Sequence, residues 1–366
     1  MNDPLLYVRA VHYAATILVA GTIFFVVAIA EPAFRAAAGA AELRLAVRRR
    51  IAWIAWLSLA AALVSGAAWF LLVAESMSGQ PLNEVLSQGV LWTVALQTDF
   101  GRDWLLRFAL VCVLAGLFVP FLAARRLSSA WLDAAVVIAA AVLAGTLVWA
   151  GHGSDGEGAA AIVHPIADFL HLDAASAWVG MLVPLGVLLA AVEPDQASLA
   201  LARTAIVRFS SFGMVIVATL LVTGSINTWY LAGSIPALAD TPYGHLLLIK
   251  ISLFLVMVAI AAVNRLRLTP RLARDLQAGA AAAALRQLRR NAALEAAIGA
   301  VVIAIVAVLG TLPPGNHPHH QMTAATARAD AALRHVDCEQ DMAEIRSEPG
   351  RVATARARAI TGQRNR

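Results

Sequence analysis

Residues 245–263 read HLLLIKISLFLVMVAIAAV, with Lys250 as the one formally charged side chain. A helix needs about 20 consecutive apolar residues to cross the hydrocarbon core of a bilayer. Backbone polar groups at that depth must be satisfied inside the protein, so this run predicts a transmembrane α-helix. Seven further runs share this character: Leu5–Ala30, Ile51–Ala74, Trp104–Ala124, Trp131–Ala150, Ile166–Val192, Ile206–Ala232 and Ala292–Leu312. The sequence therefore predicts an all-α, polytopic membrane helix bundle of about eight transmembrane helices within residues 1–314.

The composition also indicates a protein of the lipid bilayer. Of the 366 residues, 60% are hydrophobic and 14% are charged, whereas a typical soluble domain has about 25% charged residues. The net charge of +5 comes with arginines that stand between the apolar runs. That placement is typical of membrane topology, so we expect no nucleic-acid partner.

The positions of the arginines predict the orientation. They gather in the loops after the first, third, fifth and seventh runs, whereas the loops 151–163 and 233–244 contain no Lys or Arg. Cytoplasmic loops are enriched in Lys and Arg. We therefore expect both termini on the outer, periplasmic side. Residues 315–366 are polar and lack a sustained apolar face, which predicts a disordered C-terminal tail.

The stretch 164–173, HPIADFLHLD, contains the main candidate site. His164, Asp168 and His171 are spaced i, i+4, i+7 and therefore share one helical face. Ionisable side chains within a membrane usually face the bundle interior and mark function. Imidazole is a common ligand for copper and zinc, and a carboxylate can bind the metal or orient a ring. The row predicts a metal site that opens toward the outer face.

Other histidines lie near the same face of the membrane. Two of them are His12, in the first run, and His152, in an outer loop. Further candidates for accessory ligands are a soft sulfur, a histidine that begins the seventh run, and a short histidine-rich tract in the tail. These are Met181, His245, His317, His319 and His320.

The same row also has a purely structural explanation. In that interpretation Asp168 forms an ion pair with an arginine from another helix, and Arg9 and Arg107 are the candidates. Asp173 could serve in a structural cluster of the same kind. The residues alone leave both interpretations open.

Common catalytic motifs are absent from the sequence. There is no Walker-type phosphate loop and no H-E-x-x-H. There is also no G-x-S-x-G and no C-x-x-C. We therefore expect that the protein is not an enzyme and does not itself hydrolyse ATP.

Four segments resemble the copper resistance protein D family (CopD, also called PcoD) of the bacterial inner membrane. They are residues 91–107 (LWTVALQTDFGRDWLLR), 170–185 (LHLDAASAWVGMLVPL), 223–267 and 289–314. The runs TPYGHLLLIK at 241–250 and LGTLPP at 309–314 are the most specific. One departure is that Gly180 is followed by Met181, where the family usually has a second glycine. The resemblance covers a core of about residues 90–314.

The resemblance implies a multi-pass protein of the bacterial inner (cytoplasmic) membrane that handles copper. It also implies a periplasmic copper-binding partner of the CopC type. On this resemblance the expected metal ligands are His12, His152, His164 and His171, with Asp168 in support. Three functions remain open from the sequence. The first is copper import or delivery from the periplasmic face through a histidine site. The second is a b-type cytochrome in which His12 and His171 hold haem b and electrons are passed on or copper is reduced. The third is a docking protein for a copper chaperone without transport.

Overall fold

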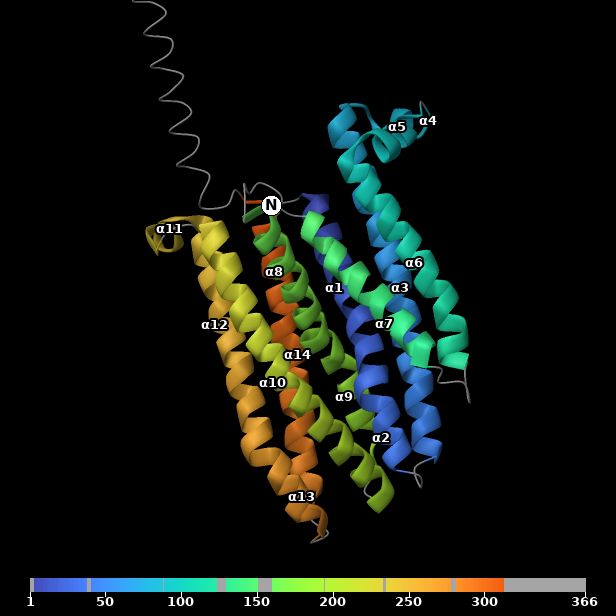
Figure 1. The fold of residues 1–366 in the computed structure, drawn as a ribbon, viewed down its shortest axis with the longest axis vertical. Coiled ribbons are helices and arrows are strands. Elements are labelled where there is room, and N and C mark those ends of the chain that lie inside the picture. The colour runs from blue at the N-terminus through green and yellow to red at the C-terminus, as the bar shows by residue number, and fades with distance from the viewer. Residues whose placement is uncertain are drawn as a thin grey trace, which may run out of the picture. The chain divides into compact units, whose positions relative to one another are not determined.

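The computed structural model describes residues 3–37, 41–87, 89–123, 130–150, 160–193, 195–232, 235–277 and 281–312. All regular elements in these ranges are helical (Figure 1). Seven continuous helical segments in the described part are long and apolar enough to cross a membrane: Pro4–Ala36, Ala41–Ser78, Ala130–Trp149, Ala161–Ala191, Gln196–Leu231, Pro242–Asp275 and Ala282–Leu309. The predicted all-α, polytopic membrane bundle is therefore confirmed. The predicted disordered tail, 315–366, lies outside the described residues.

The predicted span Trp104–Ala124 corresponds to α6 (Asp99–Ala123), which packs beside α3 (Ala41–Ser78) and α7 (Ala130–Gly145). At 1.5 Å per residue, its 25 residues reach roughly 37 Å, more than the ~30 Å hydrocarbon core. Two short helices, α4 (Leu82–Ser87) and α5 (Val90–Gln97), precede it. The total of eight spans and the orientation stay predictions.

The two ends of the bundle differ in the short helices that they contain (Figure 1). We call one the α5 end, where α4, α5 and α11 (Ile235–Asp240) lie, and the sequence predicts that it is periplasmic. We call the other the α13 end, where α2 (Glu31–Ala36) and α13 (Thr269–Gln277) lie. Arg271 and Arg274 of α13 lie at this end, and Arg265 and Arg267 directly precede that helix.

Helix α1 (Pro4–Phe25) is central to the packing, since it contacts α3, α7, α9 (Met181–Ala191) and α14 (Ala282–Leu309). Its first turn is fixed by Asp3, whose carboxylate accepts a hydrogen bond from the Leu5 amide at 2.9 Å. Pro4 at the first helical position has no amide hydrogen to satisfy. A short π-helical segment, η1 (Val26–Ala30), continues α1 into α2.

Two other π-helical segments interrupt long helices. One is η3 (Ser176–Gly180), which joins α8 (Ala160–Ala175) to α9. The other is η4 (Asn264–Leu268), which follows α12 (Pro242–Val263). Such bulges are rare and often stand at functional sites. A 3-10 segment, η2 (Thr146–Ala150), follows α7.

Helices extend past the predicted apolar runs at the α13 end. Helix α10 (Gln196–Ala232) and α14 each begin ten residues before the runs expected at Ile206 and Ala292. Three arginines, of which Arg289 lies in the α14 extension, donate to main-chain oxygens of other segments. The donors and acceptors are Arg208 to Ala28 at 2.8 Å, Arg265 to Ser210 at 3.0 Å and Arg289 to Val192 at 2.9 Å. These arginines therefore stabilise the bundle in addition to any effect on topology.

Gly21 of α1 and Gly180 of η3 lie in backbone contact. A Cβ added at Gly21 would stand 2.3 Å from the main-chain carbon of Gly180, and one at Gly180 would stand 2.3 Å from the Ile17 oxygen. No side-chain rotation relieves a contact with backbone. Gly180, together with Gly21, therefore sets how closely α1 can approach the α8–α9 segment.

We predict that Gly21→Ala and Gly180→Ala each destabilise the bundle by about 1–3 kcal/mol or more, because a methyl group must push the helices apart. The matched control is Gly116→Ala on α6, where an added Cβ meets nothing within 4 Å. The measurement is the denaturation midpoint in detergent, followed by circular dichroism. Equal midpoints for all three variants would contradict the assigned contact.

Candidate functional site

The predicted row on α8 faces α10. His164 Nε2 lies 3.4 Å from Asp168 Oδ2. The other oxygen of Asp168 accepts a hydrogen bond from Asn227 Nδ2 at 2.5 Å. His171 Nδ1 lies 3.0 Å from the Thr223 hydroxyl oxygen. Each residue of the predicted row thus contacts another residue of the row or a residue of α10. The two partners on α10, Thr223 and Asn227, are one helical turn apart.

The hydrogen bonds of Thr223 determine the tautomer of His171. The Thr223 hydroxyl donates to the main-chain oxygen of Thr219 at 2.7 Å, so its oxygen accepts from His171 Nδ1–H. A neutral imidazole has one N–H and one nitrogen lone pair, which leaves the lone pair on Nε2. Histidines that bind metals commonly donate their other N–H in this way. His171 therefore has the tautomer that a metal ligand needs.

A lysine from α12 lies near the same row. Lys250 interacts electrostatically with Asp168 and His171, and its cation therefore counters the Asp168 carboxylate when both are charged. We call the set His164, Asp168, His171, Thr223, Asn227 and Lys250 the α8–α10 cluster. The sequence analysis did not identify Thr223, Asn227 or Lys250 as its members. A polar residue inside an apolar run was the available signal.

His12 belongs to a second cluster, between α1 and α3. Its Nδ1 lies 3.2 Å from the Ala62 oxygen and 3.2 Å from the Ser65 hydroxyl, which itself donates to the Ala61 oxygen at 2.5 Å. Nδ1–H therefore donates to Ala62. His12 Nε2 is buried and has no hydrogen-bond partner among the described residues. His12 thus has the same tautomer as His171.

Aromatic rings surround the His12 imidazole. Its centroid is 5.6 Å from that of Trp69 and 5.1 Å from that of Trp104, and 3% of the residue is exposed. Gly66 leaves room for this packing, since a Cβ there would stand 2.9 Å from the Trp104 ring and 3.3 Å from His12 Cε1. Trp69 and Trp104 therefore cover part of the His12 imidazole.

The arginines proposed as partners of Asp168 lie by the His12 cluster. Arg107 donates to the main-chain oxygen of Thr146 at 2.6 Å and lies over Trp104, 4.6 Å from the ring centroid. Arg9 lies over Trp69 at 5.1 Å. The pairing of Asp168 with an arginine is not what the structure shows, because Asn227 and His164 occupy its two oxygens. Asp173 Oδ1 is buried without a hydrogen-bond partner in the described part of the chain.

The structure does not bring the predicted ligands into one set. His12 contacts α3 and α6, whereas the α8 row contacts α10. Within the described ranges, no group of three or more His, Cys, Asp or Glu side chains is placed to hold a metal ion. His152 lies in 151–159, and His317, His319 and His320 lie beyond 312, outside the described residues. Their contribution stays a prediction.

Two accessory candidates lie apart from the α8–α10 cluster. Met181 is buried in an apolar cluster with Leu182 and Trp178. His245 Nε2 lies 2.5 Å from the Ala239 oxygen of α11, so this side chain anchors the beginning of α12. Neither contact connects them with His171.

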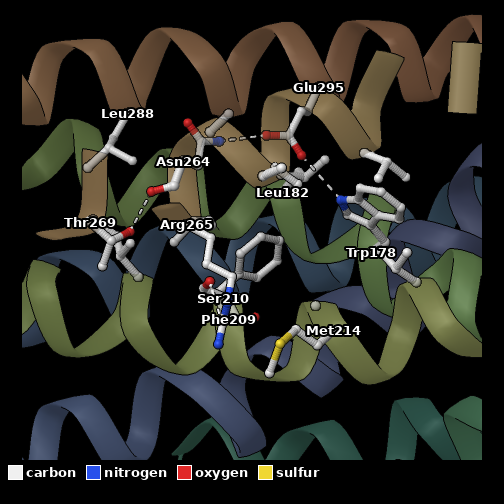
Figure 2. A pocket seen from close by; sticks show the side chains of 18 of the residues that line it. Trp178, Leu182, Phe209, Ser210, Met214, Asn264, Arg265, Thr269, Leu288 and Glu295 are labelled. Atoms are coloured by element: carbon white, nitrogen blue, oxygen red, sulfur yellow. Dashed lines mark hydrogen bonds between the residues drawn. The ribbon is translucent and has the colours of Figure 1, made fainter. Parts of the chain in front are cut away.

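A third polar cluster surrounds Glu295 on α14, which the sequence analysis missed (Figure 2). Glu295 is 1% exposed and accepts hydrogen bonds from Trp178 Nε1 at 3.2 Å and Asn264 Nδ2 at 2.8 Å. Asn291 donates to Asn264 Oδ1 at 2.6 Å. The two residues that donate to Glu295 are Trp178 of η3 and Asn264 of η4. The Glu295 carboxyl group therefore connects both π-helical segments to α14. We call Glu295, Trp178, Asn264 and Asn291 the Glu295 cluster.

Comparison with known proteins assigns the chain to a family. Residues 1–163 match the family model described as copper resistance protein D-like, N-terminal domain, and residues 203–309 match copper resistance protein D. The copper resistance protein D of Pseudomonas syringae pv. tomato is 36% identical over 221 residues, which cover 60% of this chain and 70% of the relative. The chain belongs to the copper resistance protein D family. The resemblance stated from the sequence is confirmed.

Two further relatives are named as an inner membrane protein and a copper transport protein. Inner membrane protein YebZ of Escherichia coli (strain K12) is 32% identical over 308 residues, covering 84% of this chain and 97% of the relative. Copper transport protein CutJ of Bacillus subtilis (strain 168) is 30% identical over 254 residues, 68% of this chain and 44% of the relative. No solved structure matches the chain. The protein is therefore a copper-related, multi-pass membrane protein.

We predict that Asn227→Ala destabilises the bundle by about 1–3 kcal/mol, because it leaves an oxygen of Asp168 without its donor. The control is Ser225→Ala on the same helix, since Ser225 bonds only to the Leu221 oxygen of its own α10 turn. Unfolding in a denaturing detergent, monitored by tryptophan fluorescence, measures the difference. An Asn227 variant as stable as the Ser225 variant would remove Asn227 from the cluster.

Proposed function

We propose that this protein takes up copper at the periplasmic half of the bacterial inner membrane and imports it or delivers it, with His171 Nε2 as a protein ligand. Copper is the cargo here. The observation that supports this most is the hydrogen bond from His171 Nδ1 to Thr223, which leaves the Nε2 lone pair available. Imidazole nitrogen suits copper in either oxidation state better than it suits hard cations.

The α8 row provides an ordered approach to that nitrogen. His164 and Asp168 stand nearer than His171 to the beginning of α8, which lies toward the α5 end (Figure 1). An incoming cation would meet His164 and the carboxylate before His171. The positive charge of Lys250 offsets the negative charge of Asp168. A bound cation would compete with Lys250 for the Asp168 carboxylate. A periplasmic copper-binding protein of the CopC type fits as the donor.

Relatives support copper as the cargo. Two of the similar proteins bear the names copper resistance protein D and copper transport protein. The geometry of the α8–α10 cluster supports His171 as the ligand for that cargo.

A haem shared by His12 and His171 is less well supported by the contacts. The two imidazoles contact different helices, α3 and α6 for His12 and α10 for His171. His12 is also covered by Trp69 and Trp104. The contacts of His12 with Trp69 and Trp104 leave its ring less suited to hold a haem than His171 is to bind copper.

We predict that the detergent-purified protein binds about one copper per chain and that His171→Ala weakens this affinity at least tenfold. His245→Ala is the control, because His245 bonds to Ala239 at the same end of the bundle. Elemental analysis with a copper-chelator competition gives the affinity. The same affinity for both variants would refute the ligand assignment, and a Soret band in the visible spectrum would favour the cytochrome hypothesis.

We predict that Thr223→Val weakens copper binding about 10- to 100-fold, because it removes the acceptor that fixes the His171 tautomer. Thr219→Val is a matched control, since the Thr219 hydroxyl bonds only to the Val215 oxygen of its own helix. A second measurement, copper flux into liposomes that contain the protein, distinguishes import of copper from binding without transport. Unchanged affinity in the Thr223 variant would show that Nδ1 does not orient the ligand.

A further inference from the structure

A cavity of about 340 Å³ lies among α9, α10, α12 and α14, away from the α8–α10 cluster (Figure 2). Ligand pockets in proteins usually occupy ~300–1,000 Å³. Most of its lining is apolar, with Leu182, Leu185, Phe209 and Val217 among the contributors. The volume and lining suit the body of a small lipophilic molecule.

Polar groups gather on part of the cavity wall. Glu295, Asn264, Ser210 and Arg265 all line it, and Figure 2 shows Glu295 bonded to Trp178 and Asn264. Each Glu295 oxygen accepts one hydrogen bond from the described residues, whereas a carboxylate offers about four lone-pair sites. The carboxylate therefore retains capacity to accept a hydrogen bond from a ligand.

Hydrogen-bond donors stand in the same cavity. Arg265 Nη1 donates to the main-chain and hydroxyl oxygens of Ser210, each at 3.0 Å. A guanidinium has five N–H groups in all, so Arg265 has donors beyond those directed at Ser210. A head group with both an O–H donor and a carbonyl acceptor would match this pair of side chains.

The cavity reaches the surface of α10 that faces lipid. Met214 and Leu221 line it and are 53% and 49% exposed. Exposed apolar side chains at this depth of a transmembrane helix contact acyl chains. A ligand can therefore arrive from the bilayer, which again selects for a lipophilic molecule.

We propose that this cavity binds a lipid-soluble quinone or quinol, with its ring head between Glu295 and Arg265. The quinol O–H would donate to Glu295, and a quinone carbonyl would accept from Arg265. A plain acyl chain makes no use of a carboxyl group, and burying such a group in the membrane is costly. Phe209 and Trp178 provide aromatic walls for a ring. The proposal concerns binding alone and does not depend on the copper assignment.

The test uses the full-length protein in phosphatidylcholine nanodiscs that contain no quinone. Decylubiquinone and its reduced form are titrated by calorimetry, with empty nanodiscs as the reference for partitioning. We expect saturable binding near one per chain, and an affinity for the quinol that falls at least tenfold in Glu295→Gln. Binding no greater than in empty nanodiscs would overturn the proposal and would mean that acyl chains fill the cavity.

A matched pair of variants tests the location. Gly213 lines the cavity, and an added Cβ there meets nothing within 4 Å, so the first atom of a larger side chain has room and the rest of the Gly213→Leu side chain would occupy cavity space. Gly116 of α6 is equally free of neighbours and does not line the cavity. We expect at least tenfold weaker binding in Gly213→Leu than in Gly116→Leu, with copper binding equal in both. Equal quinone affinities for the two variants would overturn this location.

Discussion

The backbone contact between Gly21 and Gly180 is the constraint on which the arrangement of the bundle depends. It brings α1 against η3 at a separation that no side chain would permit. Helix α1 then contacts α3 and α7 as well as α9 and α14. With α1 held there, His12 is directed at α3 and α6, and the row on α8 is left to contact α10. The two histidine sites thus have different neighbours in the packed bundle.

Both histidines meet the cost of a buried polar group in the same manner. Each donates Nδ1–H to a group on a neighbouring helix, the Ala62 oxygen for His12 and the Thr223 hydroxyl for His171. A buried donor without a partner costs about 1–3 kcal/mol. Donation from Nδ1 removes that cost and leaves Nε2 with its lone pair. The bond that stabilises each ring therefore also prepares it for a ligand.

The apolar runs were sufficient to predict the helical class and the places of the seven candidate spans, because a bilayer requires about 20 apolar residues per crossing. They could not show that α10 and α14 begin ten residues earlier, since these added residues lie outside the apolar runs; in α14 one of them, Arg289, donates to the Val192 oxygen. Helical spacing predicted the shared face of His164, Asp168 and His171. It could not identify Thr223 or Asn227 as their partners. Glu295 was missed because its donors, Trp178 and Asn264, are distant in sequence and meet it only in the folded bundle.

The chemistry of the deeper residues bears on whether copper passes through the bundle. Every histidine of the chain lies at position 12, 152, 164, 171, 245 or beyond 316, so no imidazole follows His171 toward the α13 end along α9. Met181 and Met257 lie within a buried apolar cluster, and Glu295 provides oxygen, which suits hard cations better than copper. If copper binds His171 as proposed, an ion that left in this direction would meet no further imidazole among the described residues. The proposed function therefore fits exchange of copper at the end of the bundle where His171 lies better than conduction along a row of histidines, and it is independent of the Glu295 cavity.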